Sequence, residues 1–133
     1  PEALSELYEA VRQRYPKRRL ISVIQPRATG GGSWVYQRRL PVALSKVDHV
    51  ILAEAYEHEP ELEREWEGGG FSNDKLVSEV SARSIPVSVI RSPAEIPAVF
   101  REVLRDGDVL VLTLPEQAVE VGDAIDSALR RGP

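Results

Sequence analysis

The sequence contains no cysteine and no methionine. Without cysteine the chain can form no disulfide framework and carry out no thiol chemistry, so we expect a reducing, cytoplasmic location. No apolar run approaches the ~20 residues of a membrane-spanning helix and no secretion signal is visible, so we expect no membrane partner. The 17 Lys and Arg residues against 21 Asp and Glu residues give a formal charge of −4, which disfavours nucleic acid as a partner.

The remaining composition is ordinary for a globular domain. The 133 residues predict one domain, and contents of 42% hydrophobic and 29% charged residues are typical of a chain that buries a core. The sequence opens at Pro1 and has no methionine anywhere, so we expect it to be a piece of a longer protein.

One stretch near the amino terminus organises the sequence. The run Leu20–Ile24 is apolar on both faces, which is typical of a strand buried between two layers of helices. The tripeptide Gln25-Pro26-Arg27 stops this strand and leaves a cation at its carboxyl end. Gly30–Gly32 then let the backbone approach a ligand closely, and Ser33 is placed to cap the next helix. Ligands of open α/β sheets bind where strands end in such loops.

Helical and strand-like patterns alternate along the chain. They predict helices over 4–15, 33–46, 72–83, 92–104 and 115–129, and strands over 20–24, 50–53, 87–90 and 109–113. Pro41 predicts a kink or a break in the second helix, and Ser92-Pro93-Ala94-Glu95 predicts a capped helix start. The stretch 54–71, with glutamates at every second position, fits neither a strand nor a helix clearly.

This alternation predicts an α/β fold with three layers: a mostly parallel sheet of Rossmann-like topology with helices on both faces. The simplest order places the first strand centrally, the second and third on one side and the fourth on the other. The switch point then falls between the first and fourth strands, where Gln25–Gly32 would face Thr113–Gln117. We take this crevice as the site hypothesis.

Arg27 is the best single candidate for function. Arginine is always charged and can bind a carboxylate or phosphate with two parallel hydrogen bonds. The alternative is a surface ion pair with Glu54. Thr29 and Ser33 could add hydroxyl donors, and Tyr56 follows the second strand close to the expected crevice.

Other patterns argue against an autonomous catalytic centre. The glycine turn lacks a Walker pattern and a dinucleotide fingerprint. His49 and His58 do not have metal-ligand spacing, and no Ser-His-Asp arrangement is indicated. Lys17, Arg18 and Arg19 are interpreted as cations that favour a helix carboxyl terminus, or else as a patch for an anionic ligand.

Three segments in this order resemble the C-terminal domain of the Mur ligases, the ATP-dependent amide-bond-forming enzymes of peptidoglycan synthesis. They are Gln25-Pro26-Arg27, the helix with Tyr36-Gln37 that leads to Val47–Leu52, and Asp106–Leu112. The similarity covers nearly the whole chain and is closest to the branch that joins a tripeptide to UDP-N-acetylmuramate in murein recycling. The branch that adds L-alanine is an alternative, as is a non-catalytic binding module of the same fold.

The resemblance implies that this domain works with a central domain of the same chain, which binds ATP and Mg²⁺. The isolated domain would be inactive and hold no cofactor. The chemistry would proceed through an acyl phosphate that the incoming amine attacks. Residues implied on the substrate side are Gln25, Arg27, Ala28, Thr29, Ser33 and Tyr56, and those on the nucleotide side are Thr113 and Glu116. One departure is the loop 113–117, which lacks the glycine usual in the family.

Overall fold

A computed structural model describes residues 2–26, 33–54, 73–115 and 118–131, with backbone alone for 33–38, 73 and 131. The elements, in chain order, are α1 (Glu2–Arg14), β1 (Leu20–Ile24), α2 (Ser33–Leu44), β2 (His49–Ala53), α4 (Asn73–Ser81), β3 (Val87–Ile90), the short 3₁₀ helix η1 (Pro93–Glu95), α5 (Ile96–Val103), β4 (Val109–Thr113) and α6 (Val119–Arg131).

The strands form one four-stranded sheet with the order β3-β2-β1-β4. All three pairings are parallel, and Ser22 in the central strand lies opposite Val50 on one side and Val111 on the other. The predicted fold class and strand order are therefore confirmed. The switch point falls between β1 and β4, as expected from the alternation of elements.

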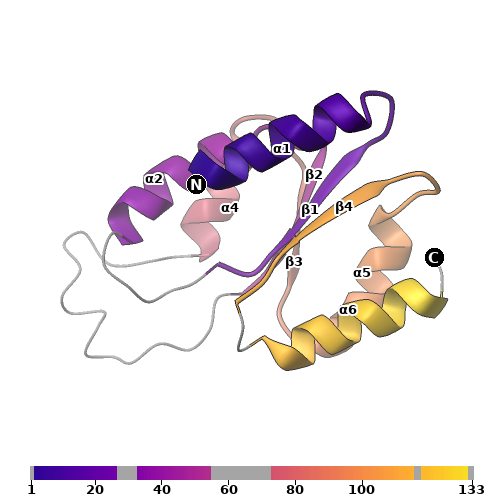
Figure 1. Ribbon diagram of the computed structural model, residues 1–133. Helices are drawn as coiled ribbons and strands as arrows, with labels where there is room; N and C mark the ends of the chain where they lie inside the picture. Colours follow the sequence, from indigo (N-terminus) through magenta and orange to yellow (C-terminus); the bar gives the residue numbers. More distant parts are fainter. Residues whose placement is uncertain (1, 27–32, 55–72, 116–117, 132–133) are drawn as a thin grey trace, which may run out of the picture.

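Helices cover both faces of the sheet (Figure 1). α1, α2 and α4 lie on one face, and α5 and α6 lie on the other. Side chains alternate along β1: Leu20 and Ile24 pack into the α1, α2 and α4 cluster, whereas Ile21 and Val23 pack into the α5 and α6 cluster. The apolar pattern on both faces of this strand is thus explained by two separate cores.

Ser22 interrupts the apolar run in the middle of β1. It is fully buried, and its Oγ lies 2.5 Å from the hydroxyl of Tyr8, which is also fully buried on α1. The pair lets two hydroxyl groups enter the core with a hydrogen bond between them. It also fixes α1 against the central strand.

Three local predictions need correction. Of the kink or break predicted at Pro41, the break does not occur: α2 continues through Pro41 and ends at Leu44 rather than at 46, and the burial of Leu40 and Leu44 holds this turn. The last helix begins at Val119 rather than Pro115, whose carbonyl instead accepts the Ala118 N–H at 3.0 Å in a preceding turn.

The predicted cap of the fourth helix is also different in detail. Ser92 precedes η1, but its side chain makes no capping hydrogen bond. The Glu95 carboxylate instead accepts the backbone N–H of Arg91 at 2.8 Å. The acidic member of the motif therefore stabilises this start, and α5 follows after one 3₁₀ turn.

Candidate functional site

The carboxyl ends of the strands meet at one edge of the sheet, which we call the carboxyl edge. Beyond the last residue of β1, the Gln25 N–H donates to the Thr113 carbonyl of β4 at 3.0 Å. Beyond β2, the Glu54 N–H donates to the Ile90 carbonyl of β3 at 3.0 Å. Backbone pairing thus extends past the strands and holds Gln25 and Glu54 rigidly. The first residues of the two ranges predicted to face one another, 25–32 and 113–117, therefore meet at the switch point, whereas 27–32 and 116–117 lie outside the described residues.

The Gln25 side chain links β1 to β2. Its Nε2 donates to the Glu54 carbonyl at 2.8 Å, and the residue is 8% exposed. A carbonyl only accepts hydrogen bonds, so this contact fixes the orientation of the amide and directs Oε1 away from Glu54. Oε1 is buried and accepts no hydrogen bond from any described residue. A buried acceptor without a partner is costly and marks a place where a donor is missing.

Glu54 and Arg91 carry opposite charges at neighbouring strand ends. The Arg91 Nε lies 3.5 Å from the Glu54 Oε1, and the side chains are 65% and 42% exposed. Sequence reasoning considered Glu54 only as a partner for Arg27 and did not consider Arg91. The signal was available, because Arg91 directly follows a strand just as Arg27 does.

The structure describes only part of the predicted site. Thr113 ends β4 and pairs with Gln25, and Ser33 begins α2, although the Ser33 side chain is not described. The remaining candidates lie outside the described residues: Arg27, Ala28, Thr29, Tyr56 and Glu116.

The opposite edge of the sheet is held by two carboxylates. Asp108 accepts two hydrogen bonds from Arg19, and Asp48 accepts the Leu20 N–H at 2.7 Å and pairs with Arg12 at 3.0 Å. Arg19 therefore serves the turn before β4 and not the end of α1. Sequence reasoning missed this role because the partner is distant along the chain.

These contacts shift pKa values in directions that follow from their causes. The hydrogen bond from Arg19 lowers the pKa of Asp108 despite partial burial. Burial opposes ionisation of Asp48, but Arg12 and the Leu20 N–H together outweigh it and lower its pKa. The pKa of His49 is lowered, mainly by burial and then by the charge of Arg19. His49 Nε2 lies 2.9 Å from the Ser88 hydroxyl, which is a structural contact between β2 and β3.

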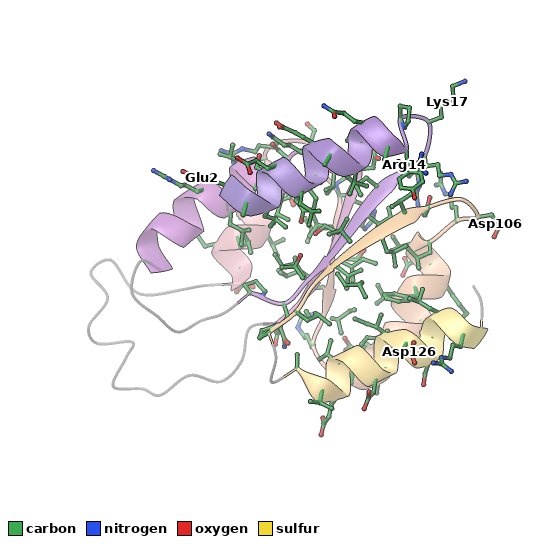
Figure 2. All side chains as sticks on the ribbon, viewed as in Figure 1. Glu2, Arg14, Lys17, Asp106 and Asp126 are labelled. Atoms are coloured by element: carbon green, nitrogen blue, oxygen red, sulfur yellow. The ribbon has the colours of Figure 1, made fainter. Side chains whose placement is uncertain are left out.

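Other cations gather at the same end of the molecule. Figure 2 shows Arg14 and Lys17 near the end of α1 and Asp106 in the turn before β4. The guanidinium carbons of Arg14 and Arg18 each lie 5.5 Å from the centre of the Tyr15 ring. These are cation–π contacts within one exposed segment.

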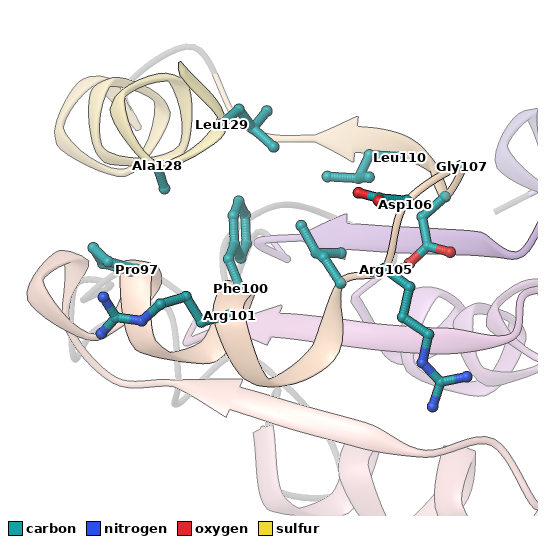
Figure 3. Close-up of a pocket in the computed structure, with 11 residues that line it drawn as sticks. Pro97, Phe100, Arg101, Arg105, Asp106, Gly107, Leu110, Ala128 and Leu129 are labelled. Atoms are coloured by element: carbon teal, nitrogen blue, oxygen red, sulfur yellow. Dashed lines mark hydrogen bonds between the residues drawn. The ribbon is translucent and has the colours of Figure 1, made fainter. Parts of the chain in front are cut away.

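A cavity of about 260 Å³ opens between α5, α6 and the start of β4 (Figure 3). The Phe100 ring stands between the two helices, and Leu110, Ala128 and Leu129 complete an apolar wall. Leu129, which also lines the cavity, is 44% exposed. The lining reaches Gly107 and Asp108 at the amino end of β4, so the cavity is separate from the carboxyl edge.

Among the described residues, no group of three or more His, Cys, Asp or Glu side chains could hold a metal ion. None of the described helices has the length and apolar character needed to cross a membrane.

Comparison with known proteins defines the class of this fold. No protein-family model matches the chain. It is similar to the crystal structure of a murein peptide ligase from Psychrobacter arcticus 273-4, with a TM-score of 0.68 and 17% identity, over 97% of this chain and 25% of that one. The chain therefore has a fold found in Mur ligases, and the resemblance drawn from its sequence is confirmed.

Two further proteins are similar to this chain. A domain assigned to a UDP-N-acetylmuramate:L-alanyl-γ-D-glutamyl-meso-diaminopimelate ligase of Haemophilus ducreyi 35000HP matches with a TM-score of 0.61 and 19% identity, over 98% of this chain and 82% of that one. A UDP-N-acetylmuramate–L-alanine ligase of Legionella pneumophila (strain Lens) is 29% identical over 113 residues, which are 84% of this chain. The chain spans about a fifth, 22%, of that curated relative.

Proposed function

We propose that this chain is the C-terminal domain of a longer cytoplasmic ligase that joins an L-alanyl amino group to UDP-N-acetylmuramate at the expense of ATP. The observation that carries the proposal is the similarity to a UDP-N-acetylmuramate–L-alanine ligase along 84% of the chain. The carboxyl edge supplies the matching geometry, because Gln25 and Thr113 meet there at the switch point of the sheet.

The proposed reaction has two steps. ATP phosphorylates the carboxylate of UDP-N-acetylmuramate, which gives an acyl phosphate and ADP. The amine then attacks the acyl carbon, phosphate leaves, and the amine nitrogen loses a proton to form the amide. ATP and Mg²⁺ would be held mainly by a central domain of the same chain. The domain described above would close over the acyl phosphate, orient the amine and exclude water.

The residues expected to act in this closed state are those of the sequence hypothesis. Gln25, Arg27, Ala28, Thr29, Ser33 and Tyr56 would face the substrates, and Thr113 and Glu116 would face the nucleotide. Arg27 is the strongest candidate, because a guanidinium can pair with a peptide carboxylate or stabilise phosphate charge.

Both acceptors considered have the same nucleophile. L-alanine and the tripeptide L-alanyl-γ-D-glutamyl-meso-diaminopimelate each present an L-alanyl amino group. The solved neighbours favour the tripeptide, since one is a murein peptide ligase and the other a domain assigned to the tripeptide ligase. The curated relative favours L-alanine.

The test is an assay of the full-length protein that contains this chain. It is incubated with UDP-N-acetylmuramate, ATP, Mg²⁺ and either L-alanine or the tripeptide, and the amide product is identified by mass spectrometry. We expect ATP-dependent product with one of the two amines. No product with either amine, together with a reading frame that lacks a Walker loop, would instead favour a non-catalytic binding module.

A further inference from the structure

The cavity between α5, α6 and the start of β4 is large enough for a small organic molecule. Its volume is about 260 Å³. Protein interiors contain few voids larger than a water molecule, whose share of liquid volume is about 30 Å³. An apolar cavity of about 150 Å³ accepts benzene. The space between the two helices can therefore hold one six-membered ring that carries a short chain.

The walls of this cavity are apolar and well buried at their centre. Phe100 lines it from α5 and is 3% exposed, and Ala128 lines it from α6 and is 8% exposed. Leu110 contributes the wall from β4 (Figure 3). Because the side chain of Ala128 is small, it leaves space that a larger residue at this position would fill. Apolar walls of this kind favour a ligand with an apolar body.

The charged side chains of the lining differ between the two ends of the opening. Figure 3 shows Arg101 at one end and Arg105 at the other, where Asp106 follows it in the chain. Asp108 also belongs to the second end, and it already accepts two hydrogen bonds from Arg19. A ligand carboxylate would meet the like charge of Asp106 at the second end. The end with Arg101 is therefore the favourable one for an anion.

Arg101 has its charge available for a ligand. Its side chain is exposed, and it makes no ion pair with any side chain within the described ranges 2–26, 33–54, 73–115 and 118–131. A guanidinium can bind a carboxylate through two parallel hydrogen bonds. An unpaired cation at the opening of an apolar cavity matches a ligand that carries its charge at one end.

We propose that this cavity binds a small carboxylate with an apolar body of one ring on a short chain. The ring would lie between α5 and α6 against Phe100, and the carboxylate would pair with Arg101 at the opening. The proposal does not depend on the ligase function. The cavity reaches Asp108 at the amino end of β4, whereas the ligase site is placed at the carboxyl edge.

The test measures binding to the full-length protein by equilibrium dialysis. The probes are phenylbutyrate, phenylbutanol and phenylbutylamine, which share a ring and a chain and differ in the charge of the head group. We expect phenylbutyrate to bind about tenfold more tightly than phenylbutanol, because its carboxylate gains charge-assisted hydrogen bonds. Phenylbutylamine should bind most weakly, because its ammonium is repelled by the guanidinium.

Variants of the lining cations test the position of the head group. Arg101→Gln should weaken binding of phenylbutyrate about tenfold and leave binding of phenylbutanol unchanged. Arg105→Gln should have a smaller effect, because Asp106 lies at the same end. Arg130→Gln is the matched control: Arg130 lies on α6 outside the lining, is 80% exposed and pairs with Asp126 at 3.0 Å, so no affinity should change.

Variants that fill the cavity distinguish it from other sites in the full-length protein. Ala128→Leu occupies the space beside Phe100 and should weaken binding of all three probes by about tenfold or more. Thermal unfolding without a probe checks that this variant folds. Leu129→Phe narrows the opening from a position that is 44% exposed, and it serves as the second variant if Ala128→Leu does not fold.

Each result decides the proposal. Absence of binding for every probe would overturn it. Binding that neither Ala128→Leu nor Leu129→Phe weakens would also overturn it, because the probes would then occupy another part of the protein. Equal affinity for the three probes, or no effect of Arg101→Gln, would show that the cavity does not select a carboxylate.

Discussion

Arg19 and Asp108 lie 89 positions apart in the sequence and are joined by two parallel hydrogen bonds, Nη2 to Oδ2 at 2.7 Å and Nε to Oδ1 at 3.0 Å. The Asp108 side chain is 4% exposed, and Arg19 also donates to the Val103 carbonyl at 2.8 Å. The start of the central strand is thereby tied to the end of α5 and to the turn before β4.

Removal of the two hydrogen bonds between Arg19 and Asp108, which we call the fork, should destabilise the fold. Arg19→Met leaves a buried carboxylate without its cation, so we expect the free energy of unfolding to fall by about 2–3 kcal/mol. Urea denaturation measures the change. Arg130→Met is the control: Arg130 pairs with Asp126 at 3.0 Å, but the side chains are 80% and 64% exposed, so it should cost under about 0.5 kcal/mol. An equal fall in the free energy of unfolding in the two variants would contradict a special stabilising role for Arg19.

The stability of the domain should fall in acid. The pKa values of Asp108 and Asp48 are both lowered in the folded chain. Their contribution is fully present above the unfolded value of about 3.9 and is lost as pH falls through the folded pKa. Urea midpoints measured between about pH 5 and pH 2 should show this loss, and Asp108→Asn should flatten it. An unchanged slope in that variant would argue against Asp108 as its source.

His49 should remain neutral at pH values at which histidine is usually protonated. Burial and the charge of Arg19 lower its pKa in the folded chain. The unfolded chain therefore binds a proton first, and the stability contributed by neutral His49 is lost as pH falls from about 6.5 through the folded pKa. Titration of the imidazole resonances by NMR checks this. A midpoint at or above about 6.5 would show that burial does not dominate.

The buried hydroxyl pair should be coupled energetically. Ser22→Ala removes a hydroxyl that lies 2.5 Å from the Tyr8 hydroxyl, so we expect a loss of about 1 kcal/mol. Thermal unfolding of Ser22→Ala, Tyr8→Phe and the double variant completes a cycle. We expect the double variant to lose less than the sum of the single losses. Strict additivity would mean that the hydroxyls do not support one another.

The proposed role of Arg27 can be tested apart from folding. In the full-length protein, Arg27→Ala should lower ligase turnover by about tenfold or more, because a charged contact to substrate or phosphate is lost. The midpoint of thermal unfolding should stay unchanged. Turnover equal to that of the unaltered protein would remove Arg27 from the site.

The sequence was sufficient for the architecture. β1 carries apolar side chains on both faces, and this pattern, together with the alternation of helices and strands, predicted a central parallel strand with two cores. The bounds of β3 and β4 were also predicted correctly. Such features depend on local patterns, which a single sequence displays directly.

The sequence was less informative about contacts between side chains that are far apart along the chain. Arg19 and Asp108 come together only because β1 and β4 are neighbours in the sheet, and no local pattern joins them. At the carboxyl edge, the backbone contact between Gln25 and Thr113 follows from topology, whereas the link from Gln25 through Glu54 to Arg91 depends on side-chain geometry. The place of Arg91 at a strand end is visible in the sequence, but its contact with Glu54 could not be inferred from spacing alone.

The fork between Arg19 and Asp108 has a mechanical consequence for the whole domain. It holds together the edge of the sheet where the strands begin, whereas the groups at the carboxyl edge are tied mainly through their backbones. A docking partner can therefore rearrange charged side chains at the carboxyl edge without loosening the opposite edge. In the proposed ligase, closure would then move the domain as one rigid body, because the strand pairing at the opposite edge is left intact.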